Sequence, residues 1–79
     1  MTEYIKLIWD FHGEDALKTA EHHVIHLKEF AQIEGLPYYE SKTEEINDNH
    51  YIAYISVERP HMIPFRDALK PHRGLKVSH

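Results

Sequence analysis

Two short segments that are apolar on both faces constrain the fold of this chain more than any other feature. Residues 4–11 and 50–58 are rich in β-branched and aromatic residues and contain neither glycine nor proline. Such composition favours strands, and a strand with apolar side chains on both faces lies inside a sheet rather than at its edge. We therefore predict that both segments are central strands of one sheet.

A long helix is predicted between these two strands. Gly13 interrupts the extended pattern, and the acidic Glu14 and Asp15 favour the positive end of a helix that starts there. The following residues keep a helical period to about Glu34, and Gly35 provides the expected C-terminal stop. The stripe predicted to be buried consists of Leu17, Ala20, Val24, Leu27 and Ala31, flanked by His23 and Phe30.

A weaker strand is predicted over residues 38–45. Its side chains are mostly polar, which suits the edge of a sheet, where charge discourages further pairing. The cluster Asn47-Asp48-Asn49 is typical of a turn. It joins this strand to residues 50–58, and the pair is predicted to form an antiparallel hairpin.

Proline and glycine divide the C-terminal segment. Pro60 ends the strand before it, and Pro64 suits the first turn of a short helix that runs to about Lys70. Gly74 precedes residues 75–77, which are predicted to form a short last strand.

The predicted order of elements is β-α-β-β-α-β, the split βαβ plan of an α+β fold with an antiparallel sheet and both helices on one face. This order resembles that of the ferredoxin-like group, which includes the dimeric α/β-barrel proteins whose two sheets enclose a pocket. The resemblance lies in element order alone. Because 79 residues accommodate one hydrophobic core, residues 1–79 are predicted to form a single domain.

The open face of such a sheet bears on oligomeric state. Since both central strands are apolar on both sides, we expect apolar side chains on the face that the helices leave bare. Contiguous apolar area of this kind usually marks an interface, and two-fold pairing of identical chains is the commonest arrangement. We therefore predict a homodimer that forms through the open sheet face.

Composition narrows the classes of function. The absence of cysteine excludes disulfides, thiolate metal sites and a cysteine nucleophile. No apolar run is long enough to span a membrane, and the acidic N-terminus lacks the pattern of a secretory signal, so we expect a cytoplasmic protein with no membrane partner. The net charge of −4 argues against a nucleic-acid partner.

Charge is distributed unevenly along the chain. Residues 1–58 carry a net charge of −8 and residues 59–79 a net charge of +4. Arg66, Lys70 and Arg73 are spaced to form a basic ridge if the short helix continues through them, and this ridge is a candidate anion-binding site. The alternative is that the basic segment pairs with the acidic part of its own chain or of a second copy.

The eight histidines suggest candidate metal ligands. His22 and His26 are four residues apart on the long helix, and Glu29 follows three residues later, so the three side chains share one face. His23 stands where the zinc-protease pattern His-Glu-x-x-His requires its glutamate, which excludes that activity. A solvated polar helix face is the favoured interpretation, and no cofactor is predicted.

Acid–base chemistry has candidates as well. Asp10 and His12 alternate onto the same face near the end of the first strand, where a carboxylate beside an imidazole can form a general-base pair. His23 borders the buried stripe of the helix, and its favoured role is that of a core histidine bonded to a carbonyl or to a tyrosine.

The sequence is compatible with three functions. The favoured one is a small homodimeric binding or assembly module without catalysis. The second is a dimeric α/β-barrel enzyme, isomerase- or oxygenase-like, that acts on a small organic ligand through Asp10 with His12 or His23. The third is a divalent-metal-binding protein that uses His22, His26 and Glu29.

Overall fold

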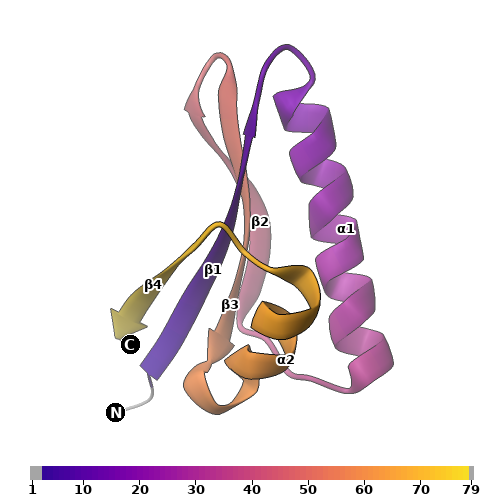
Figure 1. Cartoon of the computed structure of the whole chain (residues 1–79), viewed down its shortest axis with the longest axis vertical. Coiled ribbons are helices and arrows are strands. Elements are labelled where there is room, and N and C mark those ends of the chain that lie inside the picture. The colour runs from indigo at the N-terminus through magenta and orange to yellow at the C-terminus, as the bar shows by residue number, and fades with distance from the viewer. Residues whose placement is uncertain (1–2, 79) are drawn as a thin grey trace.

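The computed structural model describes residues 3–78 and shows an α+β fold, as predicted (Figure 1). Four antiparallel strands form one sheet in the order β2-β3-β1-β4. Within the described residues, neither main helix has the length and apolar character that crossing a membrane would require. The elements are β1 (Glu3–His12), α1 (Ala16–Glu34), β2 (Glu40–Asn47), β3 (His50–Glu58), the 3₁₀ helix η1 (Arg59–His61), α2 (Met62–Leu69) and β4 (Arg73–Ser78).

The two strands predicted to be central, β1 and β3, do lie in the middle of the sheet, and the polar β2 lies at an edge. The order of elements departs from the predicted one because η1 is inserted between β3 and α2. Pro60 lies in the first turn of η1, where its missing N–H costs nothing, and α2 follows directly from Met62. The second helix therefore begins two residues before Pro64.

Helix α1 begins later than predicted and ends as predicted. Gly13 adopts a positive φ of 106°, its N–H donates to the Asn49 carbonyl at 2.8 Å, and its own carbonyl accepts from Ala16 N–H at 3.2 Å. Residues 13–15 are therefore occupied by a turn, and the acidic pair precedes the helix. At the other end Gly35 has the left-handed φ of 66°, which glycine adopts without strain.

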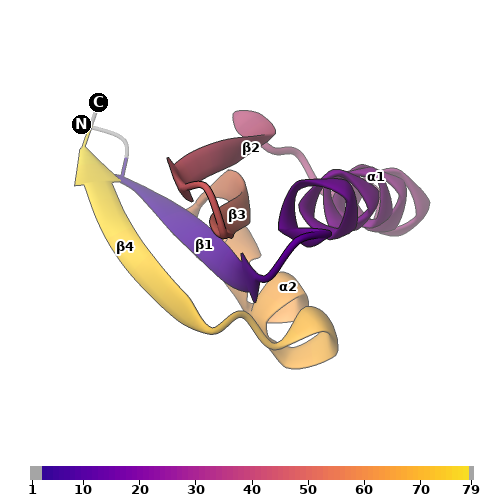
Figure 2. The ribbon, with the colours of Figure 1, turned by 90° about the horizontal axis from the view of Figure 1, so that it is seen from above.

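Both helices pack on one face of the sheet (Figure 2). Apolar side chains from β1, β3 and both helices form the main core there, and the Trp9 indole N–H donates to the Leu69 carbonyl at 2.9 Å, which ties the end of α2 to the sheet. The buried members of this core are Leu7, Trp9, Leu27, Ala31, Ile55, Val57 and Phe65.

The opposite face of the sheet differs from the prediction. Ile8, Ile52 and Tyr54 form a second apolar cluster there, yet each is at most 7% exposed in the single chain. Polar side chains cover it: the Lys6 ammonium lies 4.1 Å from the centre of the Tyr54 ring and 3.7 Å from a Glu44 carboxylate oxygen. The centre of the open face is therefore already covered within a single chain, while Leu75 of β4, which pairs with Lys6 on this face, is 49% exposed. Pairing of two copies through this face stays a prediction.

Candidate functional site

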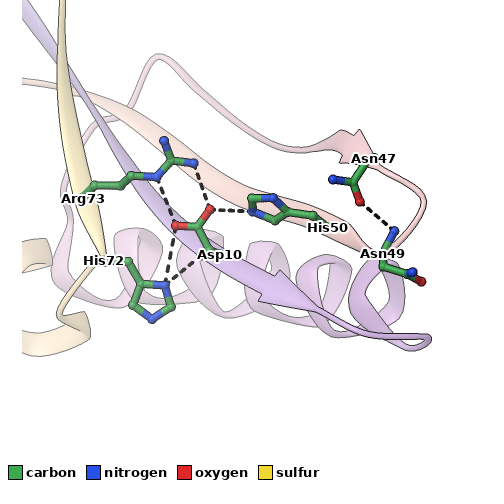
Figure 3. Close-up of polar contacts among 6 residues, drawn as sticks. All are labelled: Asp10, Asn47, Asn49, His50, His72 and Arg73. Carbon is green, nitrogen blue, oxygen red and sulfur yellow. Dashed lines mark hydrogen bonds and ion pairs between the residues drawn. The ribbon is translucent and has the colours of Figure 1, made fainter.

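The densest group of polar side chains among the described residues surrounds Asp10, on the open face near the end of β1 (Figure 3). Arg73 binds this carboxylate with two hydrogen bonds, from Nε to Oδ2 at 3.0 Å and from Nη2 to Oδ1 at 2.8 Å. His50 Nε2 lies 2.8 Å from the same Oδ1. The Asp10 side chain is 17% exposed, and both of its oxygens are occupied.

Strand register brings these residues together. Asp10 pairs with Ile52 of β3, and His50, two residues before Ile52, lies on the same face of the sheet. On the other side, Arg73 of β4 pairs with Ile8, which lies two residues before Asp10 and also on this face. The carboxylate therefore lies between one partner from each neighbouring strand. This arrangement links the C-terminal strand to the centre of the sheet.

His72 holds the backbone beside the carboxylate. The Asp10 N–H donates to His72 Nδ1 at 2.8 Å, and the His72 N–H donates to the Ile8 carbonyl at 2.9 Å. Since Nδ1 accepts a hydrogen bond, the ring proton of neutral His72 lies on Nε2. His72 thus joins the loop before β4 to β1 at two points.

The charges of the site follow from this geometry. The hydrogen bonds from Arg73, reinforced by the bond from His50, lower the Asp10 pKa to about 2, although burial acts in the opposite direction. The Arg73 pKa is raised in turn by the same contact. Asp10 is therefore a fully paired anion at neutral pH, which suits it to hold strands together and not to accept a proton.

The predicted partner of Asp10 is wrong. His12 does share a face with Asp10, but the carboxylate binds His50, and the His12 ring stacks on the His50 ring with centroids 4.1 Å apart and planes inclined by 22°. Register explains this, because His12 and His50 are paired across β1 and β3. His50, His72 and Arg73 were not predicted as partners of Asp10, and the one local signal was the excess of histidine.

His23 lies on the other side of the sheet from Asp10. Its ring packs against Trp9 and Phe11, with centroids 4.7 and 5.6 Å apart. The predicted bond to a carbonyl or a tyrosine is wrong, because Nε2 is buried and finds no partner among the described residues. Desolvation lowers the His23 pKa, and the nearby charges of His26 and His72 act in the same direction.

The predicted metal ligands are not gathered into a site. His26 Nδ1 lies 3.7 Å from Glu29 Oε1, both on the exposed face of α1, while His22 lies in a different surface depression with Asp15 and Lys18. Across residues 3–78 no group of three or more histidine, cysteine, aspartate or glutamate side chains is placed to hold a metal ion.

The predicted basic ridge of Arg66, Lys70 and Arg73 is broken, because α2 ends at Leu69 and Lys70 takes a left-handed φ of 46°. Arg66 contacts the neighbouring Asp67 at 3.2 Å, and Arg73 belongs to the Asp10 group. Three bases of the C-terminal segment pair with acids of residues 1–58 of the same chain, as the alternative proposed. These contacts are Arg73–Asp10 at 2.8 Å, Lys76–Glu3 at 2.9 Å and Arg59–Glu3 at 3.3 Å.

Comparison of the chain with known proteins finds no relative. No protein-family model matches it, and no match is found among curated proteins or solved structures. Proposals about its function therefore rest on geometry and chemistry.

Proposed function

We propose that this chain is a small binding or assembly module of ferredoxin-like architecture that works as a homodimer and carries no catalytic machinery. One observation carries the proposal: the Asp10 carboxylate, the centre of the densest polar group described, has both oxygens bound by side chains of its own chain. A group in this state stabilises the fold and is poorly placed to react with a ligand.

The ferredoxin-like assignment is supported by three features. The strand order is β2-β3-β1-β4, both helices pack on one face, and α1 connects the first two strands of the chain. In this view η1 is a short extension that leads into α2, and the split βαβ plan remains the closest description.

The homodimer is supported by size and by exposed apolar side chains. A chain of this length buries only about 60% of its unfolded surface, so a partner adds stability that its own core cannot supply. On α1, Leu17, Ile25 and Ile33 are 41%, 56% and 80% exposed. Burial of these side chains would supply part of that stability.

Analytical ultracentrifugation tests the proposal directly. We expect a species of about twice the 9.4 kDa mass of one chain at micromolar concentrations, and dissociation on dilution. A protein that sediments as a single chain up to millimolar concentration would contradict the homodimer.

A second candidate, a dimeric α/β-barrel enzyme that acts on a small organic ligand, is favoured by the His50–Asp10 contact at 2.8 Å with His12 stacked behind it. In this case Asp10 orients His50, and the second ring nitrogen of His50 is the base. Titration with small carboxylic acids, followed by NMR, separates the two functions. Saturable shifts confined to His12 and His50 would favour the enzyme, whereas the proposed module predicts none.

A further inference from the structure

The edge of β2 is the surface on which the most independent features converge. In the described part of the chain, β2 pairs with β3 along one side and with no strand along the other, so its outer N–H and C=O groups face outward. An edge of this kind is a template for pairing with a further strand. Beside it lies a depression of about 440 Å³ between β2 and α1.

The side chains of β2 specify what fits this edge. In a two-fold antiparallel pair of identical strands, residues on the same face oppose one another at positions symmetric about the axis. With the axis at Thr43, Lys42 of each copy lies opposite Glu44 of the other, so the dimer contains two such pairs of opposite charge. Ser41 of each copy lies opposite the partner's Glu45. Thr43 opposes the partner's Thr43, and threonine pairs and opposite charges are both favourable across strands.

Shifts of this register by one residue are unfavourable. An axis at Lys42 places Lys42 against the partner's Lys42, and an axis at Glu44 places two glutamates together. The β-bulge between Glu45 and Asn47 ends the regular part of β2, and the axis at Thr43 confines the pairing to the regular residues 41–45. Charge pattern and bulge therefore select the same register.

The charged residues of the neighbouring helix α1 are also complementary about this axis. Glu21, Val24, Ile25 and Lys28 of α1 line the depression together with Ser41, Lys42 and Thr43, so this part of the helix lies beside the proposed axis. A two-fold axis there makes the two α1 helices antiparallel on one face of a joined sheet. Glu21 then opposes the partner's Lys28, with the exposed Ile25 between the charges.

We infer that two copies of this chain join through their β2 edges, antiparallel and in register about Thr43, to form one continuous eight-stranded sheet. The inference rests on the proposed homodimer and adds its interface. The open sheet face stays outside the interface, and the Asp10 group of each copy remains within its own chain.

The absence of cysteine makes a direct test possible. Residues opposed in antiparallel strands have Cα atoms roughly 4.5–5.5 Å apart, within the range of a disulfide. Thr43→Cys is therefore expected to cross-link quantitatively into a covalent dimer under mild oxidation. Thr19→Cys, which replaces an exposed threonine on α1 outside the interface, is the matched control and should remain largely uncross-linked.

Charge variants check the register. Lys42→Glu turns both Lys42–Glu44 pairs of the dimer into pairs of two negative charges, and it should weaken dimerisation by about tenfold or more. Lys42→Glu combined with Glu44→Lys restores opposite charges in both pairs and should restore dimerisation. Lys70→Glu makes the same change of charge at the exposed end of α2, away from the β2 edge, and is expected to leave dimerisation unaltered.

The outcomes separate the inference from the proposed function. A wild-type protein that sediments as a monomer overturns both. A wild-type dimer in which Thr43→Cys cross-links no better than Thr19→Cys, or in which Lys42→Glu has no effect, overturns the β2 interface and leaves the homodimer standing.

Discussion

The two faces of the sheet are stabilised by different physics. On the helix-covered face, large apolar side chains from β1, β3, α1 and α2 pack with Phe65 at their centre, which is fully buried. On the open face, the small cluster of Ile8, Ile52 and Tyr54 is shielded by ion pairs and by a lysine over an aromatic ring. The first face depends mainly on burial of apolar area, whereas the second also depends on ion pairs.

This comparison shows how a thin fold can protect a sheet face that no helix covers. Long charged side chains place their methylene groups over apolar neighbours and neutralise one another above them. Such a cover is sensitive to salt, whereas the apolar packing of the helix-covered face is not. Each of the following predictions separates the two faces, beginning with the largest expected effect.

Phe65→Ala should be the most damaging substitution. It removes the central side chain of the helix-covered face and is expected to lower the free energy of unfolding by about 3–5 kcal/mol, because the rigid surroundings leave a cavity. Urea unfolding followed by Trp9 fluorescence measures this. The loss of stability should be the same in low and high salt. A loss that depends strongly on salt would contradict the view that apolar burial stabilises this face.

Asp10→Asn should have the next largest effect, on the open face. Because the Asp10 pKa is lowered from 3.8 to about 2, the carboxylate adds stability above about pH 4, and this stability is lost as the pH falls toward 2. The variant should be less stable by roughly 2 kcal/mol at neutral pH.

Unfolding measured at several pH values checks this prediction. The difference between wild type and Asp10→Asn should shrink at acid pH. Asp67→Asn is the matched control, because Asp67 contacts the adjacent Arg66 at the exposed surface, and it should change stability little at any pH. A constant difference between pH 7 and pH 2 would show that the Asp10 charge is not responsible.

His23→Leu should have a smaller effect and the opposite sign. Removing a buried nitrogen that has no partner is expected to stabilise the helix-covered face by about 1 kcal/mol at neutral pH. Because burial lowers the His23 pKa below 6.5, the unfolded chain binds a proton more readily, and the wild type loses stability as the pH falls below that value.

The free energy of unfolding of His23→Leu should therefore exceed that of the wild type by a larger amount at pH 5 than at pH 7. Thermal unfolding at these two pH values measures the change, and His22→Leu on the exposed side of the same helix serves as its control. Destabilisation by His23→Leu at neutral pH would mean that the imidazole contributes more through ring packing than its unpaired nitrogen costs.

Lys6→Met should have the smallest effect. The ammonium lies over the Tyr54 ring, and its loss should cost about 0.5–1 kcal/mol, while the methionine side chain still covers part of the cluster. Lys6→Arg retains the charge over the ring and should be nearly neutral in chemical denaturation. Equal losses for the two variants would exclude a role for the cation.

Local sequence patterns were enough to predict the main helices and strands and the positions of the strands in the sheet. Alternation and apolar content located β1 and β3 and their central position, polarity placed β2 at the edge, and Gly35 marked the end of α1. These features depend on neighbours along the chain and on burial, which periodicity records. The late start of α1 was not predicted because the turn at Gly13 is held by Asn49, far along the chain.

The partners of the polar side chains could not be predicted in this way, because they depend on the folded sheet. Asp10 binds His50 across 40 residues and Arg73 across 63, while His12, its close neighbour in the chain, stacks on His50 instead. Which side chains meet on a sheet depends on the register of strands distant in the chain, and no local pattern records that register. The cover over Ile8, Ile52 and Tyr54 arises in the same way, because strand pairing places the charged side chains around the cluster.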